Sequence, residues 1–357
     1  METQQCSENK RSQLASERSE TKVSQNMFTR ANMVANENKI YLVDSDEETG
    51  LDLFCYNKCS QNESNFIKQC RGLVFHNENL VMKAYPYTDE YSHKDVNILS
   101  NILSDFKNWT FYNAYEGALL RLFYFSGKWF LSTHRKLNAF RSKWASHESF
   151  GTLFKRALEY EVLRNPNFSQ IISNANGENI LDKFQSTLDP NMQYMFLLRN
   201  CSENRIVCTP PTPVNDPMVF HVGTFVNGKL SMTEDIGLSY PPQQTFLNMN
   251  ELVSFVETNV NPKHLQGLIC FGPNNQQLKI LHSEYMELFR ARGNEPSVKF
   301  RYLQVRMNKR LTDTLISLYP EFVSVFNEYE KDIYDIARYI YDSYVQRFIK
   351  KRYVIIP

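Results

Sequence analysis

An Asn-Gly pair at residues 227 and 228 is the feature that most constrains what this chain of 357 residues can fold into. Asn and Gly accept the positive φ angles of a two-residue hairpin turn, and the flanking segments FV and KLS have the composition of strands. A second pair of strand-like segments, ALLRLFYF and KWFLSTH, flanks Ser126-Gly127. Two such hairpins predict that antiparallel sheet dominates the middle of the chain.

Strand and helix patterns alternate around these hairpins. Strand-like runs begin at Lys39 with KIYLVD, and the runs CRGLVFH and NLVMKAY are separated by NEN, which predicts a further hairpin. Apolar residues at helical spacing predict one helix from Val96 to Phe106 and another from Phe150 to Leu163. This mixture predicts an α+β fold.

The two ends of the chain differ from its middle. Residues 1–38 are rich in Ser, Gln, Asn, Glu and Lys and poor in large apolar side chains, so we expect a disordered arm there. Strand signals stop after residue 296, and helical spacing from Phe322 to Phe348 predicts a small all-helical domain over 297–357. The remaining domain is residues 39–296. A basic cluster closes the tail, suited either to phosphates or to a helix C-terminus: Arg347, Lys350, Lys351 and Arg352.

The small net charge of the chain excludes a strong electrostatic field over the whole molecule. Forty Lys and Arg residues against thirty-nine Asp and Glu residues leave a net charge of +1, so binding of nucleic acid has to come from a local patch. A hydrophobic fraction of 42% is sufficient for a substantial core.

The cysteines and the hydropathy indicate the compartment. Seven cysteines without CxxC pairs favour reduced thiols, and no fourth zinc ligand accompanies Cys55, Cys59 and Cys70, so we expect no metal there. No apolar run reaches the roughly 18 to 20 residues of a membrane span, and the first residues contain no apolar signal core. We therefore expect a soluble, cytoplasmic protein with no membrane contact.

Four stretches occur in the order of the motifs of covalent nucleotidyltransferases: CRGLVF at 70–75, AYEGAL at 114–119, LQGLICF at 265–271 and LKILHSEY at 278–285. Between them, YMFLLRNCSENRIV at 194–207 resembles the strand-turn-strand of that family. Together they resemble the ATP-dependent RNA ligases, especially the phage T4 RNA ligase 1-like branch, over roughly residues 39–290. The helical tail resembles the small carboxyl-terminal domains of that branch.

A further stretch, STHRKLNAFRSKW at 132–144, resembles ligase-like proteins of large DNA viruses. For a viral protein, this resemblance implies a location in the virus factory or the virion. For the fold, the family resemblance implies a nucleotidyltransferase (ATP-grasp-like ligase) fold, in which two antiparallel sheets with flanking helices enclose a groove.

The same resemblance implies a chemistry that this chain has lost at four positions. In the family a lysine amine attacks the α-phosphate of ATP, and here Ala114 stands at that position. Leu197 stands in place of a carboxylate, and Gln266 replaces an acid that assists a divalent metal. Of two lysines that neutralise phosphate charge, Lys279 remains and Leu281 replaces the other.

The retained residues predict that nucleotide or RNA ends bind without a covalent adduct. Arg71 and Glu116 would face the groove, Arg135 and Lys279 would meet phosphates, and Phe196 would stack on a base. Each has a structural alternative, as a surface ion pair, a solvated strand residue or a core residue. The predicted nucleotide- or RNA-binding residues are Arg71, Glu116, Gly117, Arg135, Phe196, Gln266 and Lys279.

Two other interpretations stay open. An active RNA ligase or other nucleotidyltransferase would need a substitute nucleophile, for which Lys83 and His134 are the candidates, with ATP and Mg²⁺ as cofactors. Alternatively, the chain is a structural or scaffold protein that contacts a protein partner through its helical tail or its arm.

Overall fold

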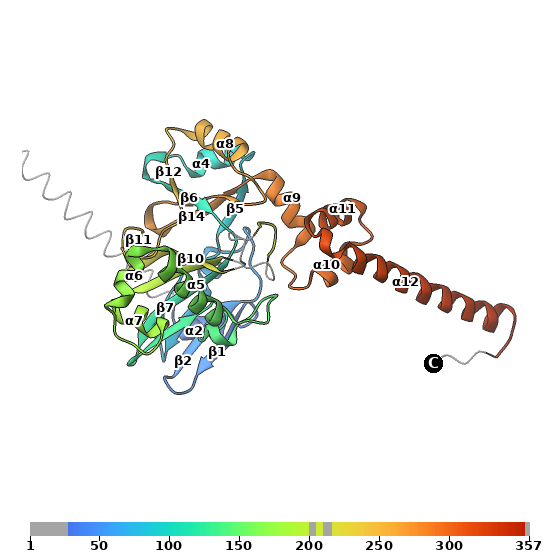
Figure 1. Cartoon of the computed structure of the whole chain (residues 1–357), viewed down its shortest axis with the longest axis horizontal. Helices are drawn as coiled ribbons and strands as arrows, with labels where there is room; N and C mark the ends of the chain where they lie inside the picture. The colour runs from blue at the N-terminus through green and yellow to red at the C-terminus, as the bar shows by residue number, and fades with distance from the viewer. Residues whose placement is uncertain (1–27, 200–204, 210–215, 354–357) are drawn as a thin grey trace, which may run out of the picture. The chain divides into compact units, whose positions relative to one another are not determined.

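The computed structural model describes residues 28–199, 205–209 and 216–353, which form two compact units that divide between His282 and Ser283 (Figure 1). The division falls before the boundary expected near residue 297, because the first helix of the tail, Ser283–Arg292, precedes that boundary. Of the expected arm, residues 1–27 lie outside the described residues. Residues 30–35 form a helix, and Phe28 and Met33 are buried, so the predicted arm extends too far.

The first sheet of the N-terminal unit has four antiparallel strands in the order β1-β2-β3-β4. The turn Asn77-Glu78 joins the last two strands, as the NEN segment predicts, and Asn77 has a φ of 53°. Two short helices pack beside this sheet, each capped by a Thr or Ser side chain. These elements are α2 Arg30–Ala35, β1 Ile40–Asp46, β2 Leu51–Tyr56, α3 Asn65–Gln69, β3 Arg71–His76 and β4 Asn79–Met82.

The second sheet contains both hairpins that the sequence predicts. Its order is β11-β10-β9-β7-β8, with Phe125 paired to Lys128 and Val226 paired to Lys229 across the two turns. The first turn residues, Ser126 and Asn227, have φ angles of 49° and 52°. The strands are β7 Ala118–Phe125, β8 Lys128–Ser132, β9 Gln193–Arg199, β10 Met218–Val226 and β11 Lys229–Ser231.

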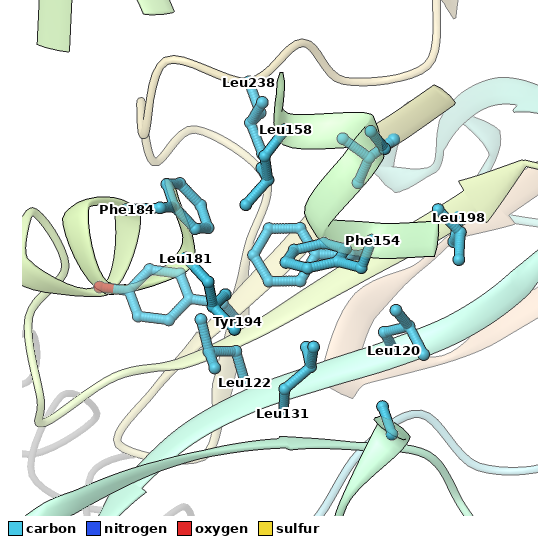
Figure 2. Close-up of a cluster of buried hydrophobic side chains, with 14 of the residues drawn as sticks. Leu120, Leu122, Leu131, Phe154, Leu158, Leu181, Phe184, Tyr194, Leu198 and Leu238 are labelled. Carbon is cyan, nitrogen blue, oxygen red and sulfur yellow. The ribbon is translucent and has the colours of Figure 1, made fainter. Parts of the chain in front are cut away.

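Three helices cover the apolar face of the second sheet. Figure 2 shows Phe154 and Leu158 of the first helix and Phe184 of the third beside Leu122 and Tyr194 of the sheet. Ser149 caps the first helix, which matches the predicted helix from residue 150 and ends one residue later than expected. The helices are α5 Phe150–Arg164, α6 Pro166–Ser173 and α7 Ile180–Ser186.

The structure has a third sheet, whereas two were expected from the sequence. Its order is β12-β6-β13-β14-β5, and the β14–β5 pair is parallel, while the other pairs are antiparallel. The helix expected over 96–106 ends at Ile102 and is followed by a 3-10 turn, Phe106–Asn108. The elements are β5 Asp89–Ser92, α4 Val96–Ile102, β6 Thr110–Ala114, β12 Gln243–Gln244, α8 Met249–Thr258, β13 Gly267–Phe271 and β14 Gln277–Leu281.

One core joins the three sheets, and we call it the central core. The first sheet contributes Leu53 and Met82, the second contributes Phe123 and Met195, and the third contributes Tyr112. Burial of these apolar side chains drives the sheets together. The class that the sequence predicts, α+β with antiparallel sheets and flanking helices, is confirmed.

The C-terminal unit is helical, as predicted. Ser297 and Asn308 cap two of its helices, and the buried Arg292 donates a hydrogen bond of 2.8 Å to the hydroxyl of Tyr319. The helices are α9 Ser283–Arg292, α10 Val298–Val305, α11 Lys309–Leu318 and α12 Val323–Tyr344, which continues into a π-helical turn, Val345–Ile349. None of the helices that the structure describes combines the length and apolarity of a membrane span.

Candidate functional site

The structure brings together Ala114 at the end of β6, Gln266 just before β13 and Lys279 in the middle of β14. Ala114 ends β6 and pairs with Gly267, and the backbone N–H of Gln266 donates to the carbonyl of Ala114 at 2.9 Å. The Nζ of Lys279 lies 3.1 Å from Oε1 of Gln266 and 3.3 Å from Oε1 of Glu90. Residues from three distant parts of the sequence therefore form one cluster, as the order of the motifs predicts.

The methyl group of Ala114 lies on the face of the third sheet that packs on the central core. Side chains alternate along a strand, and Tyr112, two residues earlier, belongs to that core. Ile269 pairs with both Tyr112 and Lys279, so Lys279 shares this face. Ala114 is only 3% exposed. The position where the family carries its lysine is thus on the inner face of the sheet.

Two glycines beside this position are required by close backbone contacts. A Cβ atom on Gly117 would lie 2.4 Å from the carbonyl oxygen of Leu198, and one on Gly267 would lie 2.1 Å from that of Ile280. Gly267 also has a φ of 148°, which L-residues rarely adopt. Both glycines allow neighbouring segments of backbone to pack closely, and neither of them identifies a ligand.

Glu116 binds the protein's own backbone. Its carboxylate accepts hydrogen bonds from the N–H of Val207, at 2.9 and 3.1 Å, and from the N–H of Cys208 at 2.9 Å. The side chain is 4% exposed, so its oxygens hold the 205–209 segment. The expectation that Glu116 faces a groove and meets a ligand is corrected by this arrangement.

Arg121 of β7 is completely buried and is held by oxygen atoms that carry no full charge. Its Nε donates to the hydroxyl of Ser132 at 3.1 Å, and its two terminal nitrogens donate to the carbonyls of Gly72 and Thr133, the latter at 2.7 Å. Burial lowers the pKa of Arg121 to about 9, a value that includes a smaller decrease caused by the neighbouring Arg71. The side chain is a buried cation at the junction of the first and second sheets.

Two further arginines and a histidine surround Arg121, and we call Arg71, Arg121, His134 and Arg135 the basic cluster. Arg135 donates to the carbonyls of Tyr56 and Asn57 at 3.0 and 2.8 Å. Arg71 donates to the carbonyl of Pro86 at 3.5 Å. Within the described ranges, none of the three guanidinium groups has a carboxylate oxygen within 4.0 Å.

His134 is the neutral member of the basic cluster at physiological pH. Burial lowers its pKa to about 3, and the charges of Arg71, Arg121 and Arg135 contribute to the decrease. Its backbone touches β3, because a Cβ atom on Gly72 would lie 2.8 Å from the Cα of His134. The cluster therefore combines three positive charges with one imidazole that stays uncharged beside them.

A shared carbonyl links the basic cluster to the cluster around Ala114. The amide of Gln277 donates to the Pro86 carbonyl at 3.1 Å, and Arg71 donates to the same oxygen. Gln277 precedes Lys279 by two residues on β14, so the two side chains share a face. Arg71 and Lys279 therefore lie on one side of the third sheet.

Phe196 belongs to the core and has no face open to a base. It is 0% exposed, and its ring lies 5.1 Å from the ring of Phe154 and 5.9 Å from that of Phe184. The alternative interpretation, a core residue, therefore applies to Phe196, and we leave it out of the site.

Lys83 points away from Ala114. Its Nζ lies 4.2 Å from the ring centroid of Phe28, and burial lowers its pKa, an effect that Cys70 partly offsets. Phe28 and Cys70 belong to the core on one face of the first sheet, whereas the neighbouring Met82 belongs to the central core. Lys83 thus lies on the opposite face from the one that Ala114 approaches.

The residues around Ala114 do not fit a Mg²⁺ ion. The side-chain oxygen of Gln266 accepts from Lys279, and the carboxylate of Glu116 accepts from backbone amides. The part of the chain that the structure describes contains no group of three His, Cys, Asp or Glu residues that could hold a metal. Cys55 and Cys70 are buried, and Cys59 is partly exposed, as free thiols.

Two arginines of this region were missed from the sequence. Arg199, at the end of β9, lies 4.1 Å over the ring of Tyr115, and burial lowers its pKa. Arg121 had a visible signal, because it is the one charge inside the apolar run ALLRLFYF. A charge in such a run has to be buried with polar partners or with a ligand.

Solved structures that resemble the chain include two forms of an archaeal ATP-dependent RNA ligase, both with TM-scores below 0.5. Form 1 of an archaeal ATP-dependent RNA ligase is 11% identical with a TM-score of 0.43, over 81% of this chain and 76% of that chain. Form 2 is 9% identical with a TM-score of 0.42, over 86% of this chain and 74% of that chain.

Comparison of sequences finds closer relatives, although no protein-family model matches the chain. The immediate-early protein ICP-46 homolog of Invertebrate iridescent virus 6 is 30% identical over 311 residues, which cover 84% of this chain and 66% of that protein. The homolog of Invertebrate iridescent virus 3 is 30% identical over 66% of this chain and 48% of that protein. ICP-46 of Frog virus 3 (isolate Goorha) is 24% identical over 73% of this chain and 64% of that protein. The chain is similar in sequence to the ICP-46 immediate-early proteins of iridescent viruses, and it spans about half to two thirds of the length of these relatives.

Proposed function

We propose that the N-terminal unit binds a nucleotide or an RNA end through its phosphate groups and forms no covalent adduct. The observation that carries this proposal is the basic cluster. It places three guanidinium groups around His134, and within the described residues none of them has a carboxylate partner.

Electrostatics supports an anionic ligand. A buried charge is costly unless an opposite charge or several hydrogen bonds compensate it, and carbonyl oxygens compensate Arg121 only in part. Phosphate oxygens match the planar donor pattern of a guanidinium group and carry the missing negative charge. Arg71 and Arg135 are only partly buried, so they are the members that a ligand would reach first.

The geometry around Ala114 supports binding without catalysis. A methyl group has no lone pair with which to attack phosphorus. Lys279 lies on the same face, but it is engaged by Gln266 and Glu90. ATP would then be a ligand rather than a reactant, with any Mg²⁺ entering on its phosphates.

The relatives support a setting inside infected cells, since they are immediate-early proteins of viruses. We infer that the protein acts there as a viral RNA ligase-like protein. Microscopy of infected cells tests its location in the virus factory or the virion.

Equilibrium binding tests the proposal. ATP, AMP and short RNAs with a 5′-phosphate or a 5′-hydroxyl are titrated into the full chain by calorimetry or fluorescence anisotropy. We expect phosphate-bearing ligands to bind more tightly than the 5′-hydroxyl RNA, and RNA affinity to fall as salt rises from 50 to 200 mM, roughly in proportion to the phosphates contacted. The double variant Arg71→Gln/Arg135→Gln should lose at least about tenfold in affinity, which corresponds to about 1.4 kcal/mol.

The control is Arg310→Gln, which removes one positive charge by the same kind of substitution from an exposed arginine in the C-terminal unit. It should leave the affinity unchanged. If none of the ligands binds, the proposal is wrong, and the structural or scaffold interpretation takes its place.

Intact-mass measurement separates binding from catalysis. The protein is incubated with each nucleoside triphosphate and Mg²⁺, beside Ala114→Lys and Lys83→Met variants. We expect no mass gain in the unmodified chain. A mass gain of one nucleotide in the unmodified protein would overturn the non-covalent proposal. If that gain disappeared in Lys83→Met, Lys83 would be the substitute nucleophile. The lowered pKa of Lys83 is the observation that supports such a role.

A further inference from the structure

Helix α12 carries a long apolar face that the other helices of the C-terminal unit leave uncovered. Phe326, in its first turn, is buried and stacks on Tyr302 of α10 with ring centroids 4.2 Å apart. Farther along, Ile336 is 60% exposed, Ile340 is 61% exposed and Phe348 is 63% exposed. Among the described residues of α12, Phe326 is the only buried one.

The exposed apolar residues form one stripe. Ile333, Ile336, Ile340 and Tyr344 are three or four residues apart, which places them on one face of the helix. From Ile333 to the end of the π-helical turn, the helix rises about 24 Å. An apolar stripe of this length on an otherwise charged helix is typical of an interface.

Acidic residues outnumber basic ones within α12, and basic residues gather after its end. Glu328, Asp332 and Asp335 lie in its first half, and within the described residues none of them forms an ion pair. The acidic Glu330 between them already pairs with Arg306. The basic cluster of the tail follows at the other end: Arg347, Lys350, Lys351 and Arg352.

We propose that α12 docks antiparallel on α12 of a second copy of this chain. With Ile340 on the two-fold axis, Ile336 of one copy lies opposite Tyr344 of the other, and the first turns of one helix approach the basic end of the other. The apolar stripes cover each other, and each acidic half meets a basic end.

Charge complementarity selects this occupant. A two-fold interface has to be complementary to itself, and the tail meets that condition because it carries an acidic half in α12 and a basic end in the π-helical turn and the residues that follow it. Parallel pairing would set like charges side by side, which is unfavourable. A nucleic acid would suit the basic end, but it would be repelled by the acidic half and would leave the apolar stripe exposed.

Analytical ultracentrifugation of the nuclease-treated full chain tests the proposal. We expect a concentration-dependent dimer whose dissociation constant rises at least about tenfold in Ile340→Glu. The matched control is Leu247→Glu, which places the same charge on a residue that is 90% exposed in the N-terminal unit. The control should dimerise like the unmodified chain, and circular dichroism should show equal helix content in all three proteins.

A charge swap tests the antiparallel register. An acidic-half variant, Glu328→Lys/Asp332→Lys/Asp335→Lys, and a basic-end variant, Arg347→Glu/Lys350→Glu/Lys351→Glu, should each dimerise more weakly than the unmodified chain. In an antiparallel pair, a mixture of the two variants places the new lysines of one chain against the new glutamates of the other, and the unchanged basic end against the unchanged acidic half, so mixing should restore the dimer. A single chain that carries both sets of changes should restore it, because its reversed charges again attract.

Three results would overturn the proposal. One is a monomer at 100 μM for the unmodified chain, as expected if the stripe docks on residues 28–282 of its own chain. Another is an unchanged dimer in Ile340→Glu. The third is a failure of the chain with both sets of changes to recover dimerisation while it remains folded.

Discussion

Arg121 illustrates how much a single residue can depend on its surroundings. Its charge is buried at the junction of two sheets, and its donors reach oxygens that belong to Gly72, Ser132 and Thr133. Glu116 is a buried negative charge, and backbone amides donate hydrogen bonds to its carboxylate. At the scale of the residue, hydrogen bonding to the backbone is what allows buried charge in this protein.

Replacing Glu116 by Gln tests the structural role of its carboxylate. The amide keeps one acceptor oxygen but loses the charge that strengthens the bonds to Val207 and Cys208, so the free energy of unfolding should fall by about 1–3 kcal/mol. Urea denaturation measures this change. Glu159→Gln, on the exposed side of α5, is the control and should change it by less than about 0.5 kcal/mol. Equal stability of both variants would show that the carboxylate does not hold the 205–209 segment.

Two histidines with lowered pKa values, His134 and His221, predict a loss of stability in acid. Burial lowers the pKa of His134 to about 3 and that of His221 to about 4, from an ordinary 6.5. Both groups bind protons more readily in the unfolded chain, so the free energy of unfolding should fall as the pH decreases from 6.5 toward 4. The decrease should be at most about 1.4 kcal/mol per pH unit for each histidine.

Thermal unfolding between pH 7.5 and 4.5 measures this effect. The variant His134→Asn should show a shallower dependence on pH than the unmodified chain, while His147→Asn, which replaces a histidine whose side chain lies outside the basic cluster, should keep the steeper one. If the stability of His134→Asn depended on pH as steeply as that of the unmodified chain, this result would contradict the burial of a neutral imidazole at position 134.

At the scale of the element, turns and close strand contacts explain where the backbone bends. The hairpins at Ser126-Gly127 and Asn227-Gly228 follow from local turn chemistry, and the structure has both. A glycine is needed at position 117 because the carbonyl of Leu198 on the neighbouring strand leaves no room for a side chain.

Replacing Gly117 by Ala should therefore destabilise the second sheet. The new methyl would lie 2.4 Å from a backbone oxygen, so β7 and β9 have to separate, and the free energy of unfolding should fall by about 1–3 kcal/mol. Gly127→Asn is the control, since no atom lies within 4 Å of a Cβ there and Asn tolerates the positive φ of the turn. Equal stability of the two variants in urea would contradict the close packing of these strands.

At the scale of the whole molecule, the chain consists of two units with separate cores. The basic cluster belongs to the N-terminal unit, and the apolar stripe of α12 belongs to the C-terminal unit. A ligand that binds only the folded N-terminal unit stabilises that unit by mass action.

Differential scanning calorimetry should therefore separate the two proposals. We expect two unfolding transitions, of which ATP raises one by several degrees at a concentration of about 100 times the dissociation constant. Ile340→Glu should affect only the other transition, by removing its dependence on protein concentration. If ATP raised neither transition, the phosphate-binding proposal would fail without affecting the proposed dimer.

The amino-acid sequence by itself determined the local structure of this protein. Turn residues, strand composition and helical spacing predicted the hairpins, α5 and the helical tail, because these features depend on neighbours within a few residues. The motif order also brought Ala114, Gln266 and Lys279 into one expected site, and the structure has these residues together.

Only the tertiary structure decided which charges are buried and which residues meet across the sheets. Arg121 and Gly72 are 49 positions apart, and Glu116 and Val207 are 91 apart, so no local pattern relates them. The third sheet and its parallel pair depend on similarly distant contacts. Local propensity acts along the chain, whereas the burial of a cation among carbonyls requires that several distant segments pack at one point.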